Sequence, residues 1–155
     1  MIREEFVSAD GLMSFDYVKG YISREDTNKI WCHPQFELLV IVRGNITYND
    51  KRGVTKITDK SVVFFKAHEV HNPCVDESAL YERYRIRFYS EATDRILKDG
   101  VSIDNLLSLS YKKGLSDSDF NEILCYVKSL YELKSSGEED TLRETVYLIS
   151  ALLSL

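Results

Sequence analysis

The sequence predicts a mainly β fold, a small antiparallel sandwich or barrel, followed by α-helices. Up to about residue 98, short apolar or alternating runs recur roughly every ten residues between turn signals, which is typical of such all-β architectures. From about Asp104 onward, the apolar residues repeat with helical spacing instead. We therefore predict a β domain over residues 1–98 and a helical segment over residues 99–155.

Two continuous apolar runs of strand length, 36–42 and 61–65, predict strands that are buried on both faces. The polar stretch NDKRG, whose Gly53 can adopt a positive φ, joins two shorter runs as a hairpin with a longer loop. The last run alternates clearly between apolar and charged residues, as a strand does. The predicted strands are 17–22, 36–42, 45–48, 54–57, 61–65 and 80–89.

Arg83, Arg85 and Arg87 form a row on one face of the last predicted strand. We expect this row to be a solvated face whose arginines pair with acidic side chains. The alternative is that the row faces the interior and holds an anionic ligand, because guanidinium geometry suits carboxylate and phosphate groups.

Two helices are predicted after the strands. The first covers residues 116–134, where Ser116 and Asp119 resemble a capping box, and Gly137 is a suitable stop. The second covers Thr141–Leu155. We expect their apolar stripes to pack first against the β domain or each other, with a part left for a partner chain. The stripe of the first helix contains Phe120, Ile123, Leu124, Val127, Leu130 and Tyr131.

Composition narrows the function classes. Twenty basic against twenty-five acidic residues give a net charge of −5, which argues against a nucleic-acid-binding module within these residues. No apolar run approaches the length of a membrane span, and the first residues do not resemble a signal peptide. Three widely spaced cysteines without a CxxC pair favour the cytoplasm. Since the chain ends inside an apolar stripe without a cap, we expect it to be cut from a longer protein.

Two short motifs carry most of the functional information: WCHPQFELLVIVRG, residues 31–44, and KAHEVHNP, residues 66–73. The pair is similar to the two motifs of the small-barrel cupins, and more narrowly resembles the N-terminal effector-binding domain of AraC-type transcriptional regulators. In that family a histidine precedes a glutamate by four residues, an apolar strand follows, and a glycine ends it. A second histidine closes the turn after a later strand. The matching residues here are His33, Glu37, Gly44 and His71.

The resemblance implies a cupin-like β-barrel (a double-stranded β-helix) that binds a small effector, a homodimer formed through the helices, and a helix-turn-helix domain beyond these residues that binds DNA. We therefore expect a non-catalytic sensor without a cofactor, in which an effector, a sugar being one candidate, shifts the populations of two arrangements. The candidate effector-binding residues are Trp31, His33, Glu37, Tyr48, His71 and Tyr84, and the candidate dimerisation residues are those of the first helical stripe.

The alternative is a metal-dependent small cupin enzyme of the dioxygenase or isomerase type. On a straight strand, His33 and Glu37 would lie roughly 13 Å apart at about 3.3 Å per residue, too far to share one metal. A turn at Pro34 would let them converge, and with His71 they would form a two-histidine, one-carboxylate set suited to Fe(II), Ni(II) or Zn(II). We favour the interpretation in which both histidines hydrogen-bond inside the barrel or line its mouth. A barrel filled by its own side chains, serving only as an interaction module, is the third possibility.

Overall fold

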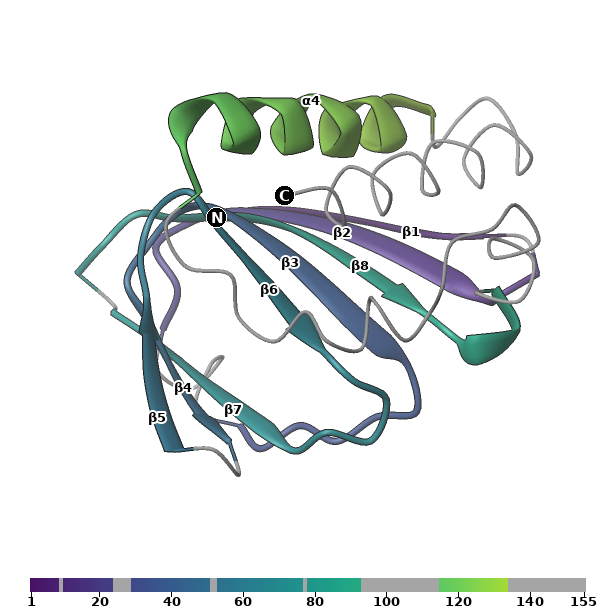
Figure 1. Ribbon diagram of the computed structural model, residues 1–155, viewed down its shortest axis with the longest axis horizontal. Helices are drawn as coiled ribbons and strands as arrows, with labels where there is room; N and C mark the ends of the chain where they lie inside the picture. Colours follow the sequence, from purple (N-terminus) through teal and green to yellow (C-terminus); the bar gives the residue numbers. More distant parts are fainter. Residues whose placement is uncertain (9, 24–28, 51–52, 77, 93–114, 134–155) are drawn as a thin grey trace.

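The computed structural model describes residues 1–8, 10–23, 29–50, 53–76, 78–92 and 115–133. Within them, eight strands form two antiparallel sheets, and a helix lies across the outer face of the larger sheet (Figure 1). The elements are β1 (Ile2–Val7), β2 (Met13–Gly20), β3 (Phe36–Arg43), β4 (Ile46–Asp50), β5 (Gly53–Ile57), β6 (Ser61–Phe65), β7 (His71–Val75), β8 (Tyr81–Phe88) and α4 (Asp117–Leu133).

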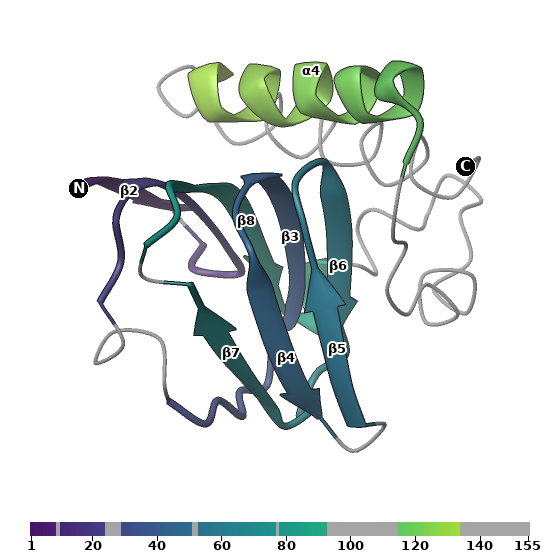
Figure 2. The ribbon, with the colours of Figure 1, turned by 90° about the vertical axis from the view of Figure 1, so that its left-hand side faces the viewer.

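The larger sheet has the strand order β1-β2-β8-β3-β6, and the smaller sheet has the order β5-β4-β7. The smaller sheet lies on the side of the larger one that is turned away from α4 (Figure 2). The predicted mainly antiparallel β fold with a following helix is therefore confirmed. The two sheets do not share a ladder, so they remain open where a closed barrel was expected.

The residues of β3 alternate between two apolar clusters, which explains why this strand is buried on both faces. Phe36, Leu38 and Val40 pack in the cluster that includes α4. Leu39 and Ile41 point the other way, into a cluster shared with the smaller sheet. We call the side of the larger sheet that faces the smaller sheet its inner face. The chain thus keeps an apolar layer under the helix and a separate interior between the sheets.

Helix α4 begins as the sequence predicts, because the Ser116 hydroxyl accepts a hydrogen bond from the backbone N–H of Asp119 at 3.1 Å. Its apolar stripe packs on the larger sheet, as expected first of all, and its role in dimerisation stays a prediction. Four of the six residues are at most 2% exposed and belong to the cluster on the outer face of the larger sheet, and the other two pack against that cluster. The buried four are Phe120, Ile123, Val127 and Leu130, and the partly buried two are Leu124 and Tyr131.

Two strands were not predicted from the sequence. In β1 the residues Arg3, Glu4 and Glu5 are consecutive charges, so the strand has no apolar alternation, and it lies at an exposed edge. In β7, Pro73 lacks a backbone donor, but the strand is an edge strand of the smaller sheet, where a missing donor is tolerated. The second predicted helix and most of the predicted helical segment lie outside the described residues. No helix of the described residues is long and apolar enough to cross a membrane.

Gly44 follows β3 and allows two segments to approach closely. It has a φ of 141°, and a Cβ atom at this position would lie 2.7 Å from Cδ2 of the buried Tyr81. Its backbone N–H also donates a hydrogen bond of 2.7 Å to the Asp59 carboxylate. Both the backbone conformation and the lack of space therefore require glycine here.

Replacing Gly44 with alanine should lower the free energy of unfolding by roughly 1–3 kcal/mol, because the new methyl group adds a clash to an unfavourable φ. Chemical denaturation measures the change. Gly53→Ala is the matched control, since Gly53 also has a positive φ (116°) but no atom within 4 Å of a Cβ. An equal loss in both variants would show that the contact with Tyr81 contributes nothing.

Replacing Ile123 with alanine should lower the free energy of unfolding by about 2–4 kcal/mol, because the side chain is fully buried between α4 and the larger sheet. Cys125→Ala, at an exposed position of the same helix, should change it little. The loss at Ile123 should not depend on protein concentration, since the contact is made within one chain. A loss that disappears on dilution would assign the residue to an interface between chains.

Candidate functional site

Backbone pairing between the two sequence motifs brings His33 and His71 together. Trp31 and His71 exchange two backbone hydrogen bonds of 2.9 and 3.1 Å, which form an isolated bridge at the start of β7. The backbone N–H of His68 donates a further bond of 2.8 Å to the carbonyl of His33. The two imidazole rings consequently meet edge to face, with their centroids 5.3 Å apart.

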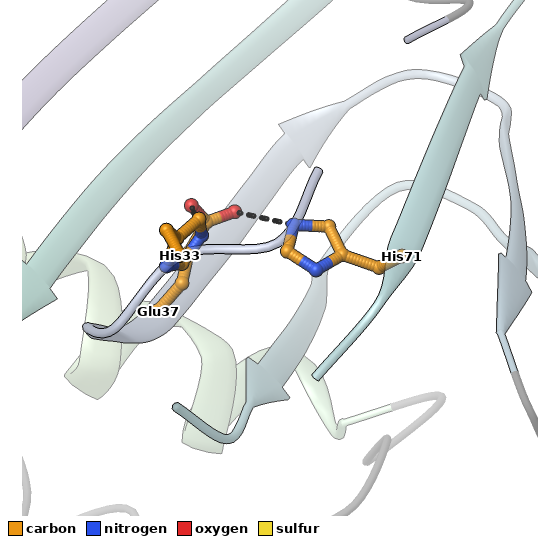
Figure 3. Close-up of side chains that lie close together, drawn as sticks. All are labelled: His33, Glu37 and His71. Atoms are coloured by element: carbon orange, nitrogen blue, oxygen red, sulfur yellow. Dashed lines mark ion pairs between the residues drawn. The ribbon is translucent and has the colours of Figure 1, made fainter. Parts of the chain in front are cut away.

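A bend at residues 34 and 35 places His33 beside Glu37. Strand β3 begins only at Phe36, so the chain between the histidine and the glutamate is not extended. The Nε2 atom of His33 lies 3.3 Å from an oxygen of Glu37, and Nε2 of His71 lies 3.9 Å from the other oxygen. The convergence that the sequence made conditional on a turn at Pro34 is therefore present, and Figure 3 shows the three side chains lying close together.

Backbone carbonyls fix which nitrogen of each ring carries the proton. Nδ1 of His33 lies 2.9 Å from the carbonyl of Gln35, and Nδ1 of His71 lies 2.9 Å from the carbonyl of Glu69. A carbonyl only accepts, so Nδ1 is the donor in both rings, and a neutral ring then presents an Nε2 lone pair. Nε2 of His33 is buried and has no hydrogen-bond partner among the described residues. The Nε2 atoms of the two rings and a buried carboxylate thus face each other.

The surroundings of Glu37 and His71 determine their charge states. Burial by itself would raise the pKa of Glu37, but contact with the His33 ring and the guanidinium groups of Arg85 and Arg87 hold it well below the usual range. Burial lowers the pKa of His71, so its ring is neutral at neutral pH. The carboxylate is therefore ionised, and at least the His71 ring offers a lone pair.

The three side chains fit a divalent metal ion. Their ligand atoms all lie within 4.8 Å of one another. Ligands at about 2.1 Å from a metal are separated by roughly 3.0–3.4 Å, so the closer pair already has a suitable spacing and the wider ones must shorten. Imidazole nitrogens whose other N–H is held by a carbonyl are the usual ligands of Fe(II), Ni(II) and Zn(II) sites. His33, Glu37 and His71 are therefore the candidate metal ligands.

The arginine row faces the interior, contrary to the expectation of a solvated face. The opposite face of β8, with Tyr84 and its alternate neighbours, packs against the apolar layer under α4, which leaves the inner face for the arginines. Arg83 and Arg85 both bind the carboxylate of Asp16 on β2, Arg85 at 2.5 Å. Arg87 donates from Nε to Glu37 at 2.6 Å. A buried line of charges thus runs from β2 across β8 to β3.

A cavity of about 270 Å³ lies against the arginine row and Glu37. Three of the candidate effector-binding residues other than Glu37 also line it: Trp31, Tyr48 and His71. Trp31 is 37% exposed and lies 5.8 Å from the Arg87 guanidinium, whereas Tyr48 is buried beside Phe65. Tyr84 does not line the cavity, because its side chain is on the helix side of β8 and contacts Tyr17 and Tyr131.

Sequence reasoning missed Asp16, which is 3% exposed and anchors the arginine row. The predicted strand began one residue later, at Tyr17, so the acidic residue was left outside it. The signal was present in the alternation of the run MSFDYV, where Met13 and Phe15 share one face and Asp16 falls on the other. An acid opposite three arginines indicates a buried ion-pair network.

Neither a family model nor a curated protein matches this sequence. Among solved structures, the Cnp3 cupin domain of Schizosaccharomyces pombe is similar, with a TM-score of 0.50 and 7% identity over 64% of this chain and 71% of that chain. A provisionally assigned mannose-6-phosphate isomerase from Ralstonia eutropha JMP134 gives 0.48 and 12% identity over 57% and 83%. The Fe(II) form of HppE gives 0.42 and 17% identity over 50% and 43%. At these identities the likeness concerns the fold, which is a cupin fold.

The expectation that the domain is non-catalytic is wrong. The described residues contain a buried two-histidine, one-carboxylate group of the kind that catalytic metals use. The narrower resemblance to AraC-type regulators stays a prediction.

Replacing Asp16 with asparagine should lower the free energy of unfolding by about 3–5 kcal/mol, because Arg83 and Arg85 then lose the carboxylate that both of them bind. Thermal or chemical denaturation measures this loss. Asp117→Asn is the control, since its ion pair with Lys60 is exposed and such pairs contribute little. A small effect at Asp16 would mean that the arginines are adequately solvated from the cavity.

Proposed function

We propose that the protein is a metal-dependent enzyme with a cupin fold, in which His33, Glu37 and His71 hold a divalent metal ion. The observation that supports this most directly is the pair of imidazole rings whose Nδ1–H groups are bound to carbonyls, with their Nε2 atoms facing a buried carboxylate. A neutral His33 would turn its Nε2 lone pair toward the Glu37 oxygen 3.3 Å away, and a cation bound between the two atoms would remove their repulsion. The arrangement therefore favours a bound cation.

Three protein ligands leave coordination positions open, so a metal here would supply Lewis-acid or redox chemistry to a bound substrate. The residues of this chain would provide the setting. The carbonyls of Gln35 and Glu69 orient the two rings, and Arg87 donates a hydrogen bond to the Glu37 carboxylate. The aromatic walls of the cavity, Trp31 and Tyr48, limit the size of what can approach. Isomerase and dioxygenase chemistry are the two reaction classes that we propose to test first.

The purified protein, loaded with Fe(II), Ni(II) or Zn(II) and dialysed, should retain close to one metal ion per chain. His33→Ala and His71→Ala should each lose most of it, because two ligands seldom hold such an ion. Elemental analysis measures the content, and circular dichroism confirms that the variants are folded.

His68→Ala is the matched control for the metal experiment. His68 lies in the same loop region but is exposed, and its ring belongs to no metal-ligating group of the described residues. This variant should keep its metal. Equal metal loss in all three variants, or no retained metal in the unaltered protein, would contradict the proposed function.

A second candidate function is the effector sensing that the AraC-type resemblance predicts. The cavity with its aromatic and arginine lining supports it, because such a site suits a small polar ligand. The corresponding test starts from a ligand that raises the thermal stability of this chain. That ligand should change the DNA affinity of the longer natural protein in a gel-shift assay, and unchanged affinity would count against this second candidate.

A further inference from the structure

The cavity concentrates positive charge in a chain whose net charge is −5. Five cationic and two acidic side chains line it. A concave site lined mostly by one sign of charge attracts ligands of the opposite sign. The cationic side chains are those of Arg3, Lys29, Arg83, Arg85 and Arg87, and the acidic ones are those of Glu5 and Glu37.

The buried part of this charge is not balanced by the described residues. Three guanidinium groups share two buried carboxylates: Asp16 binds Arg83 and Arg85, and Glu37 binds Arg87 and approaches Arg85 only to 3.8 Å. A buried cation in excess is stabilised by a bound anion.

Two of the arginines have hydrogen-bonding capacity left over. Arg87 uses Nε on Glu37, and no described residue accepts a hydrogen bond from its two terminal nitrogens. Nη1 of Arg85 is 3.8 Å from Glu37, beyond hydrogen-bond distance. Both groups line the cavity, and Arg87 lies against the Trp31 ring, which orients it. Unused N–H groups on adjacent guanidiniums match the oxygens of a carboxylate or a phosphate.

We infer that the cavity binds a small organic anion whose carboxylate or phosphate group is held by Arg85 and Arg87 beside the three candidate metal ligands. The identification of this anion as the substrate rests on the proposed function. The binding of the anion is independent of the proposed function. The volume of 270 Å³ corresponds to about nine water molecules at roughly 30 Å³ each, so the ligand is a small acid or a phosphorylated small molecule. Arg83 remains a positioning residue, because Asp16 binds it through both oxygens.

The test is calorimetric titration of the full chain with three probes at constant ionic strength: inorganic phosphate, malonate and the neutral polyol glycerol. Each titration is done once with a chelator present and once with the metal-loaded protein. Arg87→Gln removes the charge and most of the fork but keeps a donor for Glu37. Arg87→Lys keeps the charge without the fork. Arg43→Gln removes the same charge from an exposed position that does not line the cavity.

Phosphate or malonate should bind the chelator-treated protein, and the tighter of the two identifies the preferred anionic group. Arg87→Gln should weaken that binding about tenfold or more, as expected for the loss of charged hydrogen bonds. Arg87→Lys should bind more weakly than the unaltered protein, Arg43→Gln should bind as well as it, and glycerol should not bind. A thermal unfolding curve for each variant shows that it is folded.

Anion binding that is absent, or that is equal in Arg87→Gln and the unaltered protein, would overturn the inference even if the protein retains its metal. Anion binding by chelator-treated protein that retains no metal after loading would support the anion site and contradict the proposed function. Binding of malonate or phosphate only when metal is present, and unaffected by Arg87→Gln, would assign the anion to the metal and overturn the role of the arginines.

Discussion

The buried carboxylate of Glu37 is the constraint on which the interior of this protein depends. It is 4% exposed, yet it contacts Arg87 at 2.6 Å, Arg85 at 3.8 Å, His33 at 3.3 Å and His71 at 3.9 Å. An ionised carboxylate in such a place is tolerated only when cations and hydrogen-bond donors surround it. Three features of the fold bring side chains to Glu37. The arginine row points inward, the bend before β3 turns His33 back toward the strand, and the pairing of the two motifs places His71 beside them.

Along β3 and β8, successive side chains point to opposite faces of the larger sheet, so that the residues that pack under α4 and the charged residues of the site lie on different faces. On both strands, one set of side chains enters the apolar layer beneath α4, and the other set faces the smaller sheet. The helix covers the outer face and the smaller sheet lies opposite the inner face, where Asp16 is 3% and Glu37 is 4% exposed. The network from Asp16 to Glu37 then compensates most of the charge. At one end of the network, the Nε2 atoms of His33 and His71 face the Glu37 carboxylate, and unused guanidinium donors lie beside them.

The sequence predicted the long apolar strands well, because β3 and β6 are continuous runs that admit no other interpretation at their length. It also predicted the start of α4, since the capping residue Ser116 and the helical period agree. It could not decide which side of β8 faces inward. Period-two alternation assigns Arg83, Arg85 and Arg87 to one face, but both faces of the larger sheet are covered here, one by the helix and one by the smaller sheet. The same ambiguity placed Tyr84 among the candidate ligand-binding residues.

The contact between His33 and Glu37 could not be predicted from the sequence either. It depends on the backbone dihedral angles near Pro34, which the residue types alone do not determine.

Anomalous diffraction at the metal edge, from crystals of protein loaded with Fe(II), Ni(II) or Zn(II), tests the central claim most directly. The account predicts a single strong peak about 2.0–2.2 Å from Nε2 of His33, Nε2 of His71 and one oxygen of Glu37, with Arg87 still hydrogen-bonded to this carboxylate. It would be contradicted by a Glu37 carboxylate that is paired directly with a protonated His33 and has no metal beside it.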